Sequence, residues 1–410
     1  MKTPAIYLSI LATSVASLCA QEPTVAEQLQ EMQERIDELE ELQAETSERV
    51  EGRALLRTFS AMEIDLGGHV TSIFSHIEGV ADSATGHQLT LLELFLKARI
   101  SDEWSIFAAP AFFTFNGALL DNPASPTVAG DPFFSADTSS SPNITLGRAY
   151  AEYSPYDELR IQGGVIGSLH GTTNREYFIS ARNIVSASLH TRVFTANQLF
   201  PQVLRGVKAS GKLMQNGSQW FEYDIYAGVD SISAAEPLSG LRVAFACNET
   251  GLTVAANVGQ GTRSAAPVPG RNFGVVQSPF PVNSFLEHDY RFGGIDVDWR
   301  NVDFMVRGEA YYSAEDGLLD QRALSVESTW FASAEWGLSY RFDYYDAGSD
   351  LNPLLPTPAI LDRGTSTEHA FGLMYEPDPS VRLRLDFHHN NLPSTDDTVQ
   401  YVNLSWTVSF

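Results

Sequence analysis

The chain has 410 residues and a formal net charge of −25. This surplus of negative charge argues against nucleic acid as a partner, because phosphates bind to a basic surface. Beyond the first twenty residues, no apolar run approaches the ~18 residues that a transmembrane helix needs. If the chain crosses a membrane, it must therefore do so as a closed β-barrel, the other fold that pairs every backbone group in lipid.

Residues 1–20 have the sequence pattern of a secretory signal peptide. A cationic start at Lys2 precedes an apolar stretch from Ile6 to Leu18, which is too short and too polar for a membrane span. The cleavage position, after Cys19 or after Ala20, stays open. Export would leave Cys247 as the only cysteine, so we expect no disulfide framework.

Residues 21–58 are predicted to form an acidic periplasmic coiled coil. Between Glu22 and Glu51 the sequence holds eleven acids against two arginines. Apolar positions recur there with alternating spacings of four and three residues, the 3.5-residue period of a coiled coil. The seam consists of Val25, Leu29, Met32, Ile36, Leu39, Gln43, Thr46 and Val50. A solvated acidic helix and a disordered leader are the alternatives.

Residues 59–410 change to period-two alternation in segments of about ten residues, the length of a tilted strand through a membrane. In the last segment, apolar side chains from Val402 to Phe410 share one face and polar side chains from Tyr401 to Ser409 the other. The sixteen segments lie near 61–75, 89–100, 104–115, 144–153, 158–167, 203–214, 218–230, 240–248, 251–259, 290–299, 301–312, 323–332, 335–345, 366–375, 381–389 and 398–410. This pattern predicts an all-β fold, a transmembrane antiparallel barrel of about sixteen strands.

The connections between these segments alternate in length. Short turns follow the even-numbered segments, and longer loops follow the odd-numbered ones, with large loops near 116–143, 168–202, 260–289 and 346–365. Short inner turns, long outer loops and an even strand count are the arrangement of outer-membrane barrels. On the predicted inward faces, eleven basic residues stand against ten acids, which suits a water-filled lumen better than a packed core.

The third loop, 168–202, is the longest and the most basic. From Ser168 to Phe221 the only acid is Glu176. We expect this loop to fold into the barrel and to set a charged constriction together with wall residues. The candidate solute-binding residues are Arg175, Arg182, Arg192, Lys208, Lys212, Arg341, Arg382 and Arg384. Alternatively, these arginines pair with lumen carboxylates or with neighbouring subunits.

The heptad leader, the long third loop and the terminal Phe410 resemble the trimeric sixteen-stranded porins, in particular the phosphate-selective O/P-type porins. The resemblance implies passive diffusion of small hydrophilic solutes, without catalytic residues or cofactors. It also implies a homotrimer among the lipids of a Gram-negative outer membrane, with Phe410 recognised by the barrel assembly machinery. In that family, third-loop and wall cations bind anions, but the residues do not match one by one, so an anion preference is only an expectation here.

Two other functions compete with a channel. A structural tether would engage the envelope through the coiled coil, and deleting residues 24–51 would separate the two, since a channel keeps its conductance. A barrel-embedded lipid hydrolase is disfavoured, because Ile166 replaces the first glycine of a Gly-x-Ser-x-Gly motif around Ser168. We expect no metal site, because the adjacent His388 and His389 point to opposite faces of a strand.

Overall fold

The structure is a computed structural model. It describes residues 63–78, 84–115, 143–167, 170–172, 182–186, 188, 199, 203–230, 237–264, 287–315, 320–346, 349–351, 360–362, 365–392 and 397–410. The predicted signal peptide (1–20) and coiled coil (21–58) lie outside these residues. No helix in the described ranges is long and apolar enough to cross a membrane.

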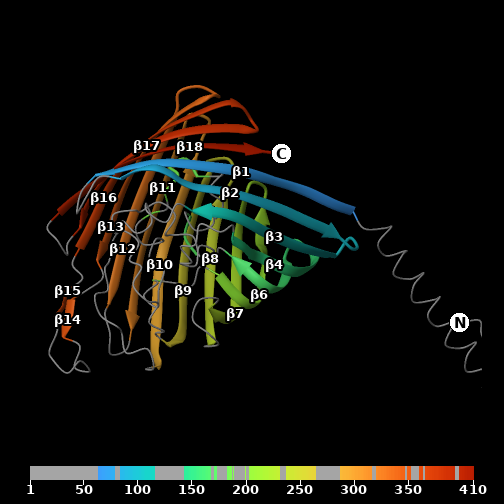
Figure 1. The fold of residues 1–410 in the computed structure, drawn as a ribbon. Helices are drawn as coiled ribbons and strands as arrows, with labels where there is room; N and C mark the ends of the chain where they lie inside the picture. The colour runs from blue at the N-terminus through green and yellow to red at the C-terminus, as the bar shows by residue number, and fades with distance from the viewer. Residues whose placement is uncertain are drawn as a thin grey trace, which may run out of the picture. The chain divides into compact units, whose positions relative to one another are not determined.

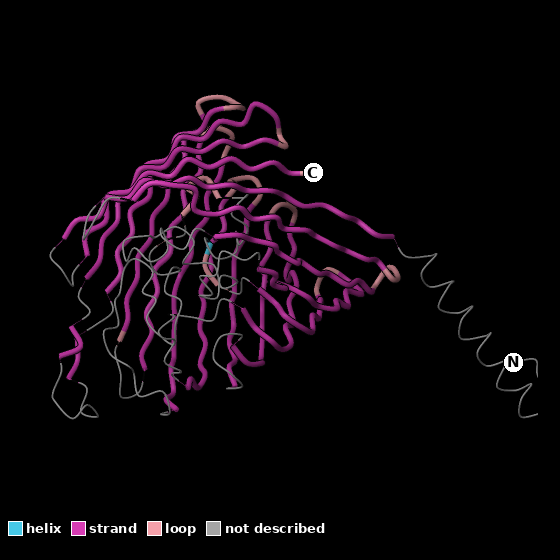
Figure 2. The backbone as a smooth tube through the Cα atoms, viewed as in Figure 1, coloured by secondary structure: helices cyan, strands magenta, loops and turns pink. Residues whose placement is uncertain are grey.

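Sixteen antiparallel strands form one closed barrel, in which β1 pairs with β2 on one side and with β18 on the other. Figure 1 traces the strands in chain order, and Figure 2 shows that strands make up nearly all of the described chain. The strands are β1 (Glu63–Glu78), β2 (Ala84–Arg99), β3 (Trp104–Phe115), β4 (Asn143–Tyr156), β5 (Leu159–Gly167), β6 (Val203–Asn216), β7 (Gln219–Asp230), β8 (Pro237–Cys247), β9 (Leu252–Ser264), β10 (Glu287–Arg300), β11 (Phe304–Glu315), β12 (Gln321–Phe331), β13 (Trp336–Asp346), β16 (Thr365–Asp378), β17 (Val381–Leu392) and β18 (Asp397–Ser409). The predicted strand number is confirmed, and each predicted segment overlaps one strand, with ends that differ by at most five residues.

One short hairpin lies outside the barrel. Strands β14 (Ser349–Leu351) and β15 (Ile360–Asp362) pair with each other in the connection between β13 and β16. They interrupt a predicted long loop without joining the barrel, so the count of membrane-length strands is unchanged.

The barrel is polar inside and apolar outside, the reverse of a soluble protein. On the outer face, Leu404 of β18 is 54% exposed and Phe410, which follows the strand, is 63% exposed, whereas Asn403 and Ser405 are fully buried on the inner face. The predicted faces of this segment are therefore confirmed. Large exposed aromatic side chains lie near the short-turn ends of other strands as well, as in the girdle of a membrane barrel. They are Trp104, Phe304, Trp330 and Trp336.

The first and last strands close the barrel. Gly68 and Phe410 exchange two backbone hydrogen bonds, with N···O distances of 3.1 and 3.0 Å. Inside the seam, the Thr71 and Thr407 hydroxyls are 2.9 Å apart. The register begins at His69 and ends at Glu78, so the strand residues before Gly68 extend past the end of β18 and pair only with β2.

Side-chain hydrogen bonds and glycines with positive φ stabilise the short turns. In the turn before β11, the Asn301 side-chain oxygen accepts hydrogen bonds from the backbone N–H groups of Asp303 and Phe304, at 2.9 and 2.7 Å. Gly217 and Gly251 adopt φ values of 60° and 65°, which favour glycine. These local features keep the β6–β7, β8–β9 and β10–β11 connections short.

Candidate functional site: the inner wall and the third loop

Charged side chains on the inner wall pair with one another across strands. Arg242 on β8 lies 3.2 Å from Asp296 on β10, and both side chains are 1% exposed. Arg307 on β11 lies 3.0 Å from Asp298 on β10. Basic and acidic residues predicted for the inward faces thus form ion pairs with one another. The pairing lowers the desolvation cost of placing charges inside the barrel.

The third loop enters the barrel and is anchored first at His170. The Asn257 amide donates to Asp296 at 2.7 Å, which leaves its oxygen to accept from His170 Nδ1 at 3.0 Å. His170 Nε2 then accepts from the Tyr226 hydroxyl at 2.6 Å. Burial of this loop residue lowers its pKa from 6.5 to about 4, so the imidazole is neutral near pH 7.

Gly171 lets the chain approach the wall closely at this anchor. Its φ is 74°, and a Cβ at this position would lie 2.4 Å from a carboxylate oxygen of Glu309 on β11. A larger residue would need both a strained backbone and a displaced acid. Residues 170–172 of the loop are therefore held against the β7–β11 part of the wall.

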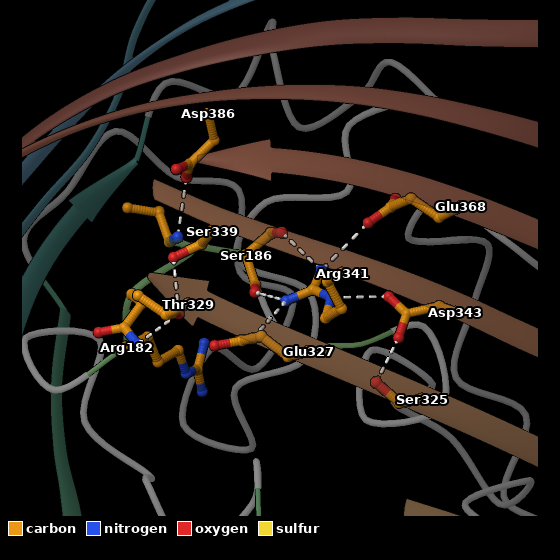
Figure 3. A network of polar contacts seen from close by, with 12 residues as sticks. Arg182, Ser186, Ser325, Glu327, Thr329, Ser339, Arg341, Asp343, Glu368 and Asp386 are labelled. Carbon is orange, nitrogen blue, oxygen red and sulfur yellow. Dashed lines mark hydrogen bonds and ion pairs between the residues drawn. The ribbon is translucent and has the colours of Figure 1, made fainter. Parts of the chain in front are cut away.

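A second anchor holds loop residues Arg182–Ser186 against β13 and β17. Arg341 on β13 donates from two guanidinium nitrogens to the Ser186 carbonyl at 2.7 Å and the Ser186 hydroxyl at 3.0 Å. The Val185 N–H donates to Asp386 at 2.8 Å, and Arg384 donates to the Arg182 carbonyl at 2.8 Å. Figure 3 shows Ser186 of the loop between Asp386 and Arg341.

Arg341 is the centre of this second anchor. Besides Ser186, it binds Asp343 at 2.8 Å and Glu368 on β16 at 3.1 Å, and all three charged side chains are at most 1% exposed. Figure 3 shows its guanidinium group between the loop and the two carboxylates. Ser325 on β12 donates a further hydrogen bond to Asp343 at 2.6 Å. The arginine therefore joins three strands to the third loop.

The predicted site residues fall into separate groups. Arg341 and Arg384 are each 1% exposed and bind the loop, and Arg182 is 9% exposed. Arg382 forms an ion pair with Glu376 on the same side of the barrel. On β6, Lys208 lies 3.6 Å from Asp224, and the Lys212 ammonium lies over the Trp220 ring at 4.5 Å. Arg175 and Arg192 lie outside the described residues.

The structure adds anchor residues that were not proposed as site residues. Asp386 and Asp296 belong to the ten acids on the predicted inward faces, but the sequence does not indicate that they accept hydrogen bonds in the loop network. Asn257 and Ser186 carry no charge and gave no signal in the sequence. His170 stood in the loop that we expected to fold inward, which was the one available indication.

The inner wall differs in water access from one side to the other. On β4–β7 the charged inner side chains meet solvent: Arg160 is 53% exposed, and Lys208 and Asp224 are 16% and 18% exposed. On β13 and β16, where the loop is anchored, Asp343 and Glu368 are fully buried. Nearer the short-turn end of the same side, Arg382 and Glu376 are 24% and 25% exposed. The loop thus excludes water from the wall residues that it covers.

No protein-family model matches the chain, and no curated protein matches its sequence. Solved structures do match. An anion-selective porin from Comamonas acidovorans aligns with a TM-score of 0.56 and 10% identity over 85% of this chain and all of that chain. The outer membrane channel DcaP of Acinetobacter baumannii aligns at 0.54 and 10% over 86% and 98%. The trimer form of OmpT from Vibrio cholerae aligns at 0.54 and 12% over 85% and 100%. The likeness shows that this chain has the sixteen-stranded barrel fold seen in porins.

Proposed function

We propose that the protein is a passive channel for small hydrophilic solutes in the outer membrane of a Gram-negative-type bacterium. The observation that carries the proposal is a closed barrel with an apolar outer face and a charged inner face. Contact with lipid requires the apolar outer face, and a water-filled path requires the charged inner face. A homotrimer, as in the trimeric form of OmpT, is part of this proposal.

The solute path runs along β4–β7, opposite the second anchor. The inner side chains that meet water there include Arg160, Lys208 and Lys212 among the cations and Glu152 and Asp224 among the acids. Because charges of both signs lie side by side on the inner wall of β4–β7, they create an electric field across the lumen rather than a lining of one sign. A wall of this kind supports permeation of varied small polar solutes with weak charge preference.

A preference for anions is the sharper version of the proposal. It depends on Arg175, Arg182 and Arg192 in the third loop, together with Lys208 and Lys212 on the wall. The reversal potential in a salt gradient tests it. Cation selectivity that is unchanged when Arg175, Arg182 and Arg192 are replaced would rule out this version while leaving a channel.

A planar bilayer recording of the purified full chain tests the channel itself. We expect stepwise openings, in groups of three if the assembly is a trimer. Absence of conductance at every voltage, from protein that migrates as a folded barrel, would reject the proposal.

A further inference from the structure

A stacked pair of aromatic rings faces the lumen on β3 and β4. The rings of Phe107 and Tyr150 have centroids 5.3 Å apart and planes 27° apart. Phe107 follows Ile106, which is 43% exposed on the outer face, so the period of two turns Phe107 inward. Both rings are partly exposed. In a water-filled barrel they present apolar surface to water, which is unfavourable unless another molecule or chain segment covers it.

Inner rings on the opposite part of the wall are covered by the third loop. On β10–β13, four inner rings are at most 5% exposed and cluster with Leu199 of that loop; they belong to Tyr290, Phe292, Tyr311 and Tyr345. The Phe107–Tyr150 pair differs from this cluster because both of its rings stay partly exposed. An apolar face in this position is suited to a solute that passes along the wall.

The pair is held in place by its neighbours on the wall. Tyr150 packs against a buried cluster on β5–β8 that consists of Ile166, Leu204, Tyr226 and Leu238. A ring that is already fixed by packing loses little freedom when a solute stacks on it, so the cost of binding is low. The two rings therefore form a preorganised aromatic surface on the inner wall.

A cation stands beside this aromatic surface. Lys97 on β2 is directly opposite Phe107 in the register, and its side chain is exposed. Asp65 on β1 is its register neighbour on the other side. Among the described residues, however, no carboxylate lies within ion-pair distance of the Lys97 ammonium, Asp65 included. The ammonium can therefore bind an anionic group of a solute.

The acid next to the aromatic surface is already occupied. Glu152 lies two residues from Tyr150 on β4 and accepts a hydrogen bond from the Gln162 amide at 2.7 Å. It also lies 3.7 Å from Arg160, which is 53% exposed. The charge left at this part of the wall is therefore positive, which favours an anion over a cation.

We propose that Phe107, Tyr150 and Lys97 form a binding site for aromatic carboxylates. The ring of the solute stacks on the Phe107–Tyr150 pair, and its carboxylate pairs with the Lys97 ammonium. The inference rests on the proposed channel and names a class of solute for it. An aliphatic carboxylate lacks the ring, and a neutral aromatic amide lacks the charge, so both bind more weakly.

A second ring pair provides a matched control. Phe221 on β7 stands directly opposite Phe245 on β8, and their ring centroids lie 5.5 Å apart. Phe221 is 42% exposed on the outer face, so this pair faces away from the lumen. Phe245→Leu removes the same kind of ring as Phe107→Leu but leaves the lumen unchanged.

The experiment measures dissociation constants for benzoate, cyclohexanecarboxylate and benzamide by saturation-transfer NMR on the purified full chain in micelles, with empty micelles subtracted. The wild type should bind benzoate more tightly than the other two. Phe107→Leu should weaken benzoate about fivefold, the scale of one aromatic stacking contact, and change cyclohexanecarboxylate little. Lys97→Gln should weaken both carboxylates and leave benzamide unchanged. Phe245→Leu should affect none of the three.

Several outcomes would overturn the site. They are equal affinity for benzoate and cyclohexanecarboxylate, an equal loss in Phe107→Leu and Phe245→Leu, and a loss of unfolding free energy in Phe107→Leu with benzoate affinity intact, which would make the rings part of the wall packing. Conductance is recorded on the same samples. Normal conductance without benzoate binding would reject the site alone, whereas absent conductance in the wild type would reject the channel.

Discussion

The two sides of the inner wall have the same kinds of residue but different environments. On β13 and β16, Arg341, Asp343 and Glu368 are buried where Arg341 holds the third loop, whereas on β4 and β5 the Glu152–Arg160 pair remains in contact with water. A charged residue that faces the inside of a barrel is therefore not by itself a pore-lining residue. Its role depends on whether a loop covers it.

Arg341→Ala should produce the largest effect, because it leaves Asp343 and Glu368 buried without their shared cation. Breaking a buried ion pair by removing one partner costs about 3–5 kcal/mol of unfolding free energy. Urea unfolding in detergent micelles would measure this loss, and single-channel conductance should rise as the loop is released. Arg160→Ala, on the water-exposed side, is the control and should change stability by less than about 1 kcal/mol. Equal losses in both variants would contradict the distinction between the two sides.

Acidification should loosen the first anchor. The pKa of His170 is lowered from 6.5 to about 4 by burial, so between these values the unfolded chain binds a proton that the folded chain excludes. The contribution of His170 to the free energy of unfolding is therefore complete above pH 6.5. It falls as the pH drops toward 4, by about 3 kcal/mol in total. Urea unfolding at a series of pH values measures this slope. In His170→Gln the fall in unfolding free energy between pH 6.5 and about pH 4 should disappear. An unchanged pH dependence in this variant would mean that other groups cause it.

Gly372→Val tests how closely the loop packs on β16. A Cβ at Gly372 would lie 3.1 Å from the Ile184 side chain and 3.2 Å from an Asp386 oxygen. Overpacking of this kind costs about 1–3 kcal/mol and should displace the loop, which would appear as noisier conductance. Gly308→Val on β11 is the control, because the nearest atom to its Cβ is a backbone oxygen at 4.0 Å. Equal noise in the two variants would argue against contact between loop and wall.

Lys208→Gln should have the smallest effect on stability and a clear effect on permeation. Its partner Asp224 is partly exposed, so the lost pair is worth less than about 1 kcal/mol. Asp224 keeps Arg242 as a partner at 3.9 Å, but one positive charge is lost beside it, which should shift the reversal potential in a salt gradient toward cation preference. No shift would place the solute path elsewhere on the wall.

The sequence was sufficient for the strands but not for the loop anchors. Period-two alternation, as from Val402 to Phe410, fixes which side chains face lipid, because a shift of one residue would reverse every one of them. Arg341 was correctly assigned to the inner face for the same reason. That it binds Ser186, 155 positions earlier, could not be inferred, because loop–wall contacts follow no local period. Its predicted contact with solute stays a prediction, although in this structure its guanidinium group binds the loop.

The seam between β1 and β18 has a consequence for the order of folding. The hydroxyls of Thr71 and Thr407 meet across 336 positions of sequence, so this contact forms only after almost the whole chain is available. Closing so long a loop carries an entropy cost that neighbouring hairpins avoid, which makes seam formation a late and slow step. Until then both terminal strands present open backbone edges, which could pair with another chain. The interval between export and closure is thus the stage at which this protein most needs protection from aggregation.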